Sequence, residues 1–166
     1  MINSLLIGLV AGSRAMTPFA AVADAAHEGR LPLDNGAPRW LGSPVVAAGT
    51  KMLAAGELWG DKLESAPDRI VIAGLLARLV TGGIAGAALA PRRQALAGAA
   101  LGAGGAILAA YVTFNLRIRA MRRFSQKSTG LVEDALTVGA AKMVVSGAAR
   151  GRQLSASVAK TMPPKR

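Results

Sequence analysis

Several ionisable side chains interrupt segments that are otherwise apolar enough to lie in a lipid bilayer. They are Arg14, Glu57, Asp61, Arg78, Glu133 and Asp134. An ionised group in the bilayer core costs about 2.5 kcal/mol or more, so it is normally paired or hydrated. Carboxylates in that setting can bind protons or cations, whereas arginines can balance them or bind anionic groups bidentately. These residues therefore indicate a charged site at mid-depth in a membrane, without naming its ligand.

Two of the acids lie four residues apart. Glu57 and Asp61 share one face if the segment around them is helical. Their mutual repulsion would suit proton coupling or cation binding. Alternatively, each acid pairs with a buried base, for which Arg14 and Arg78 are the candidates, or the pair lies at a hydrated helix end. The sequence leaves these alternatives open.

The first apolar segment contains its own interruption. Arg14 and Thr17 lie between Gly12 and Pro18, and Pro18 lacks the backbone donor that a continuous helix needs. We expect the helix to break there, and protein or water must then satisfy the freed backbone groups. Arg14 could bind an anion at the break or anchor Glu57 or Asp61.

The remaining charges are placed differently. Arg78 is the only charge in residues 70–90, too deep to reach the nearer surface easily, so it should face the bundle interior. Glu133 and Asp134 are adjacent and cannot share one helical face. At the start of a last helix they could simply stabilise the helix dipole, by a few tenths of a kcal/mol. A functional role is the alternative.

The elements that must position these residues are long and apolar. Residues 1–23, 70–90 and 94–116 carry at most one charge each, and about 20 apolar residues suffice to span a bilayer. Two further segments, residues 43–63 and 130–149, are apolar but contain more charged residues. We predict an all-α integral membrane bundle of four or five transmembrane helices, with the first helix broken. Residues 1–149 would form one domain, and residues 150–166 a basic, disordered tail. An Ala-rich soluble bundle is the alternative.

Small residues dominate the predicted helices. Hydrophobic residues reach 52% although aromatic residues are only 4% of the chain. Glycines recur at four-residue spacing, which allows close helix packing and could support a homodimer. These pairs are Gly8 with Gly12, Gly82 with Gly86, and Gly98 with Gly102.

The net charge of +11 does not indicate nucleic-acid binding, because the basic residues gather at the ends of apolar segments and in the tail. Basic flanks are typical of topology signals and of contacts with anionic lipid headgroups. The chain has no cysteine and one histidine, His27, so thiolate and histidine metal sites are not expected. We expect no cofactor, no metal and no enzymatic activity, and a multi-pass location in the inner (plasma) membrane.

A faint internal symmetry accompanies this pattern. The first two segments are an apolar, glycine-containing helix followed by a helix with two acids, and the last two repeat that order. The third segment would invert the second pair, and inverted repeats of this kind are common in transporters.

Four short motifs also carry a resemblance. The stretches GSRAMTP, GELWGDKL, ARL and GLVEDAL resemble an uncharacterised bacterial membrane family catalogued as "domain of unknown function 4126". The resemblance covers residues 5–148 and implies a small all-helical membrane protein without an established activity. Its motif positions are Arg14, Thr17, Pro18, Glu57, Asp61 and Asp134.

Two functions remain in view from the sequence. The first is a small transporter or channel that moves an unidentified solute or ion past the charged midplane site. The second is a structural or assembly protein whose buried ion pairs fix helix packing.

Overall fold

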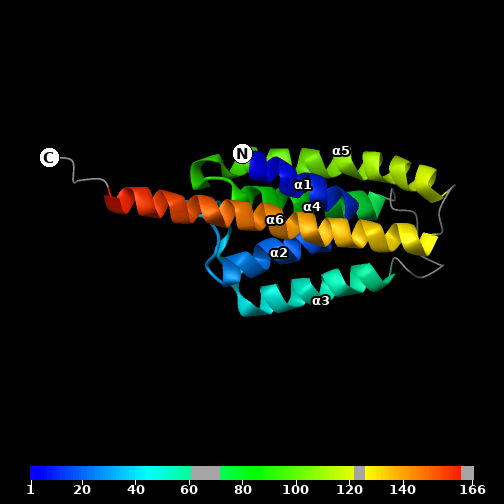
Figure 1. Cartoon of the computed structure of the whole chain (residues 1–166), viewed down its shortest axis with the longest axis horizontal. Coiled ribbons are helices and arrows are strands. Elements are labelled where there is room, and N and C mark those ends of the chain that lie inside the picture. Colours follow the sequence, from blue (N-terminus) through cyan, green and yellow to red (C-terminus); the bar gives the residue numbers. More distant parts are fainter. Residues whose placement is uncertain (61–71, 122–125, 162–166) are drawn as a thin grey trace.

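The chain forms a bundle of helices. The computed structural model describes residues 1–60, 72–121 and 126–161, and no strand occurs in these ranges (Figure 1). The helices are α1 (Ile2–Ser13), α2 (Met16–His27), α3 (Pro44–Gly60), α4 (Ile72–Leu89), α5 (Ala95–Met121) and α6 (Gln126–Thr161). Short 3₁₀ turns, η1 (Arg39–Gly42) and η2 (Arg92–Gln94), precede α3 and α5. The prediction of an all-α protein is confirmed.

The first apolar segment breaks where the sequence predicts. Arg14 adopts an extended conformation (φ −141°, ψ 118°), which ends α1, and α2 begins at Met16. Pro18 is the third residue of α2, where a missing N–H removes no helical hydrogen bond.

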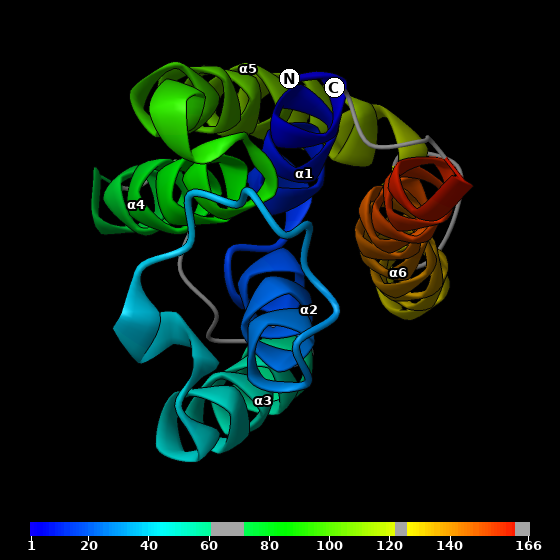
Figure 2. The ribbon, with the colours of Figure 1, turned by 90° about the vertical axis from the view of Figure 1, so that its left-hand side faces the viewer.

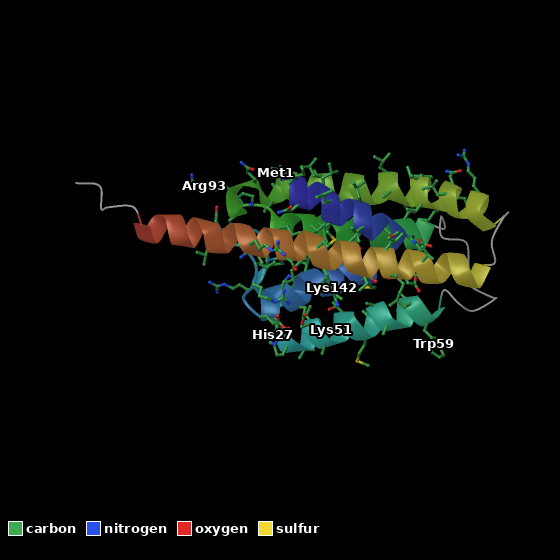
Figure 3. The ribbon with its side chains drawn as sticks, viewed as in Figure 1. Met1, His27, Lys51, Trp59, Arg93 and Lys142 are labelled. Carbon is green, nitrogen blue, oxygen red and sulfur yellow. The ribbon has the colours of Figure 1, made fainter. Side chains whose placement is uncertain are left out.

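The break also reverses the chain direction, which the sequence did not predict. The N-terminus of α1 and the C-terminus of α2 lie at the same end of the molecule, as Met1 and His27 show (Figure 3). Each helix has 12 residues, or about 18 Å, which is too short for a hydrocarbon core of about 30 Å. Residues 1–23 therefore form a helical hairpin and not a single crossing helix.

Glycines hold α1, α4 and α5 together. These helices lie against one another on one side of the molecule (Figure 2). A Cβ at Gly8 would overlap the backbone of Gly102, and one at Gly102 would overlap the carbonyl oxygen of Gly82. Gly86 and Gly98 meet in the same way. The small side chains thus allow backbone-to-backbone contact along this layer.

The other half of the hairpin lies in a second layer. Helix α2 packs against α3, η1 and α6, so α1 and α2 join the two layers. Residues 28–43 connect α2 to α3 and bury Leu31 and Leu41 in the core. Gly36 donates its backbone N–H to the Ala90 carbonyl oxygen (2.9 Å), which fixes this connection against the turn between α4 and α5.

Helix α6 differs from the prediction. It is a single helix of 36 residues that continues to Thr161, whereas residues after 149 were expected to be disordered. No proline occurs after Gln126 until Pro163, so no residue of the tail forbids helix before that point. Glu133 and Asp134 are the eighth and ninth residues of α6, beyond its first turn, so a simple helix-dipole role at the N-terminus does not apply.

The unbroken helix α5 does not match the broken first segment, its expected counterpart in the inverted repeat. Helix α5 runs unbroken over Ala95–Met121, whereas the first segment is broken and folded back. The two halves of the proposed repeat therefore have different shapes at the level of their helices.

Two described helices are long and apolar enough to cross a membrane. They are Ile72–Leu89 and Arg92–Leu116, and Ile2–Ser13 is apolar but shorter. Only 39% and 33% of the two long segments are buried inside the molecule. Most of their surface is therefore available to a surrounding apolar medium.

Candidate functional site

Several long-range hydrogen bonds and an ion pair lie at the chain reversal between α1 and α2. We call residues 12–16 the hairpin tip. The end of α1 and the start of α2 expose backbone groups here that have no partner within their own helices. Side chains from α3 and α4 satisfy several of them, and side chains from α6 bond to the side chains of Ser13 and Arg14. The tip thus lies where these three helices converge on the hairpin.

Glu57 of α3 caps the second half of the hairpin. Its two carboxylate oxygens accept hydrogen bonds from the backbone N–H groups of Ala15 and Met16, each at 2.9 Å. A negative charge at a helix N-terminus is also favoured by the helix dipole. Glu57 therefore takes the place that an anion would occupy at the start of α2.

Arg14 is the buried cation of the tip. Its side chain is only 1% exposed and forms an ion pair with Asp134 of α6, whose side chain is 13% exposed. Its Nη1 also donates to the backbone carbonyl oxygen of Glu57 at 3.2 Å. One guanidinium thus connects the tip to α3 and α6 at once.

Helix α4 reaches the tip through Arg78. Its Nε donates to the carbonyl oxygen of Gly12 at 3.1 Å, a group that the end of α1 leaves without a helical donor. Arg78 is 7% exposed. The sequence-based expectation that Arg78 faces the interior is thus met, and its described hydrogen bond is to backbone.

Hydroxyl groups complete the contacts with α6. The Ser13 and Thr137 oxygens lie 2.9 Å apart, and Thr137 Oγ1 also donates to the Glu133 carbonyl oxygen at 2.8 Å. The sequence reasoning missed both residues. Thr137 lies one helical turn after Glu133, and that spacing was the available signal. Ser13 lies inside the predicted break.

The predicted site residues are thus partly brought together. Arg14, Glu57, Arg78 and Asp134 meet at the tip, while Glu133 lies beside them in α6. Thr17 is buried in the first turn of α2. Asp61 lies outside the described residues, so the predicted shared helical face of Glu57 and Asp61 stays a prediction. The partner found for Arg14 is Asp134, which the sequence did not single out for it.

The tip lies about halfway along the longest apolar helix. A Cβ on Gly12 would overlap Ala109 and would come within 2.7 Å of the Ala110 nitrogen. Both alanines are near the middle of α5 (Ala95–Met121). The six predicted packing glycines all lie at such close contacts, and in this way they set the depth of the tip along α5.

The charged side chains of the tip are held by protein partners. Among the residues that the structure describes, no group of three or more acidic or histidine side chains could hold a metal ion. Arg14 pairs with the Asp134 carboxylate, Arg78 donates to the Gly12 carbonyl oxygen, and the Glu57 carboxylate accepts from two backbone N–H groups. These contacts are those of a structural lock, and a ligand at the tip would have to replace one of them.

Fold and site together define an all-helical protein with two candidate membrane spans and a buried charged tip in a helical hairpin. Comparison with known protein families, with characterised proteins and with solved structures gives no significant match.

Proposed function

We propose that the chain is a multi-pass membrane protein in which α3, α4, α5 and α6 cross the bilayer and the α1–α2 hairpin enters it from one side without crossing. Exposed apolar side chains support this proposal. Ile72, Leu96, Leu108 and Val45 are 78%, 87%, 62% and 79% exposed. A soluble monomer rarely leaves many large apolar side chains in water on several helices at once, whereas lipid would cover them. The resemblance of the tip motifs to a bacterial membrane family fits an inner-membrane location.

We propose further that this protein moves a small ion or solute past the hairpin tip. The observation that carries the proposal is the break at Arg14, where two short helices end among buried charges. Broken helices at mid-depth are a recurrent way to build an ion or substrate site, because non-helical backbone in a membrane is tolerated where protein or water satisfies it. Asp134 would exchange protons or cations, while Arg14 supplies the counter-charge.

One observation favours a second candidate function. Both carboxylate oxygens of Glu57 are engaged by backbone N–H groups, and Arg14 is almost completely buried. A non-transporting protein that uses these bonds to fix the hairpin would need the same geometry. The two functions differ in whether water reaches the tip.

A single cysteine at Thr17 tests this difference. The native chain has no cysteine, and Thr17 Oγ1 has no hydrogen-bond partner among the described residues, so Thr17→Cys removes no described bond. In oriented membrane vesicles, a membrane-impermeant thiol reagent is applied from each side in turn. Transport through the tip predicts labelling of Thr17→Cys.

Two further single-cysteine variants serve as controls. Leu33→Cys lies in the exposed connection between α2 and α3 and should label from one side only. Leu108→Cys lies on the outward apolar face of α5 and should remain unlabelled in lipid. If Thr17→Cys resists the reagent from both sides while the controls behave as stated, transport is rejected and the structural function takes its place.

A further inference from the structure

An apolar groove runs along the outer face of α4 and α5. We call it the α4–α5 groove, and its volume is about 460 Å³. Its walls carry no charged side chain, and they include Leu79, Gly83, Ala87, Ala99, Ala103 and Pro38. Small residues form the floor because they come from the two closely packed, glycine-rich helices. The groove therefore extends from Leu79 to Ala87 of α4 and from Ala99 to Ala103 of α5, on the side that would face lipid.

One end of the groove is fixed by the connection between α2 and α3. Gly36 N–H bonds to the Ala90 carbonyl oxygen (2.9 Å) and Arg92 N–H to the Asp34 carbonyl oxygen (3.2 Å). A Cβ on Gly36 would come within 2.7 Å of the Ala95 side chain. These contacts hold Pro38 at the point where α4 ends and α5 begins, so the groove has a defined mouth at this end.

Basic residues lie in the segments next to that mouth. Arg39 follows Pro38 directly, and Arg92 and Arg93 lie in η2, the turn that joins the two helices of the groove. All three side chains are exposed. The exposed carboxylate of Asp34 lies at the same end, so three positive charges face one negative charge. The segments next to the mouth thus carry an excess of positive charge at one end of an apolar groove.

We propose that the α4–α5 groove is a binding site for one anionic phospholipid. An acyl chain lies in the groove, and the headgroup phosphate contacts Arg39, Arg92 and Arg93. Apolar walls exclude an ionic or sugar ligand from the groove itself, and each arginine near an anionic headgroup contributes roughly fivefold to binding. This inference rests on the proposed membrane location but is independent of transport.

Fluorescence of Trp40 provides the test, because Trp40 lies two residues from Pro38 and is 49% exposed. The chain has two tryptophans, and the other, Trp59, lies at the opposite end of the molecule (Figure 3). The variant Trp59→Phe therefore reports from Trp40 alone. It is reconstituted in phosphatidylcholine vesicles that contain increasing fractions of phosphatidylglycerol with brominated acyl chains, which quench nearby tryptophan.

The proposal predicts saturable quenching with a preference for brominated phosphatidylglycerol over brominated phosphatidylcholine of about fivefold or more. Replacing Arg39, Arg92 and Arg93 together by glutamine should remove the preference, whereas Arg150→Gln, an exposed arginine on α6, should keep it. Gly83→Leu should also remove the saturable component. A Cβ at Gly83 meets nothing nearer than 3.7 Å, so leucine can occupy groove space without disturbing the helix contact.

Three outcomes would overturn the lipid site. They are equal quenching by the two brominated lipids, a preference that survives Gly83→Leu, and equally effective competition by free glycerol phosphate, which would indicate a phosphate site alone. A different result is expected if the protein is not a membrane protein at all. In that case the protein does not float with vesicles, and even brominated phosphatidylcholine leaves Trp40 unquenched.

Discussion

Arg14 is the residue on which the described contacts of the tip converge. It reaches α6 through the Asp134 carboxylate and α3 through the Glu57 carbonyl oxygen. A buried ion pair contributes little net stability when both partners are present, because desolvation offsets the attraction. Removal of one partner is different, since it leaves a charge without compensation in an apolar surrounding.

This asymmetry leads to a prediction for the pair. Asp134→Ala should destabilise the folded protein by about 3–5 kcal/mol because Arg14 keeps its charge. The double variant Arg14→Met, Asp134→Leu should recover a large part of that loss. Thermal unfolding in detergent measures both. Strictly additive losses would show that the two side chains do not act as a pair.

Glu57 stabilises the hairpin tip as a helix cap and not as a member of an ion pair. Glu57→Ala should cost about 1–2 kcal/mol, as expected for a lost helix cap. Glu57→Gln should cost less, because its amide oxygen still accepts one hydrogen bond. The same unfolding measurement checks the order of these variants. Glu28→Gln is the matched control: Glu28 is half exposed, and its pair with Arg30 is worth about 0–1 kcal/mol. Equal effects of the three variants would contradict the capping role.

At the scale of the helices, the backbone contacts of α5 with α1 and α4 hold the first layer together. Gly102 and Gly104 are two residues apart on α5 and differ in their surroundings. A Cβ at Gly102 would overlap the Gly82 carbonyl oxygen, whereas a Cβ at Gly104 would meet nothing within 4 Å. The spacing of glycines in the sequence therefore does not show which of them is needed for helix packing. The side of the helix on which each glycine lies does show it.

The two glycines make a matched pair of substitutions. Gly102→Ala should destabilise the protein by about 1–3 kcal/mol, because α4 must move away from α5. Gly104→Ala should be neutral or stabilising by up to about 1 kcal/mol, because alanine is the better helix former. Unfolding midpoints of both variants in one detergent provide the comparison. A loss at Gly104 as large as that at Gly102 would contradict the described packing.

For the whole molecule, the hairpin determines which end each terminus occupies. Because α1 and α2 return to their starting end, the N-terminus, the connection after α2 and the end of α6 all lie at one end of the bundle (Figure 1). Arg39, Arg92, Arg93 and Arg150 belong to that end, and Arg119 of α5 belongs to the other. The proposal of four crossings requires both termini at the same end, and this arrangement meets that requirement.

Cysteine labelling from the two sides of a membrane checks the arrangement. Leu33→Cys and Arg119→Cys should react with an impermeant reagent applied from opposite sides, since both positions are exposed at opposite ends of the bundle. A tag at Met1 should be accessible from the same side as Leu33→Cys. Accessibility of the Met1 tag from the side of Arg119→Cys would mean that the first segment crosses, contrary to the hairpin.

The sequence predicted local features better than the pairing between helices. Pro18 and Gly12 predicted the break, because they weaken a helix whatever surrounds it. The same residues do not specify the angle between α1 and α2, which depends on bonds to α3, α4 and α6. Arg14 and Asp134 were both predicted as candidate site residues, but 120 residues separate them, and helix periodicity carries no information about such distant pairs. The extent of α6 was missed because basic composition was taken as a sign of disorder.

The sequence separation of the Arg14–Asp134 pair has a consequence for biosynthesis. The chain is made from the N-terminus at about 5–20 residues per second, so Asp134 emerges roughly 6–24 s after Arg14. Until then the Arg14 guanidinium lacks this counter-charge, whereas Glu57 and all of α5 are already synthesised. The bonds from α3 to the hairpin can therefore form first, and the ion pair that joins the hairpin to α6 can form only near the end of synthesis.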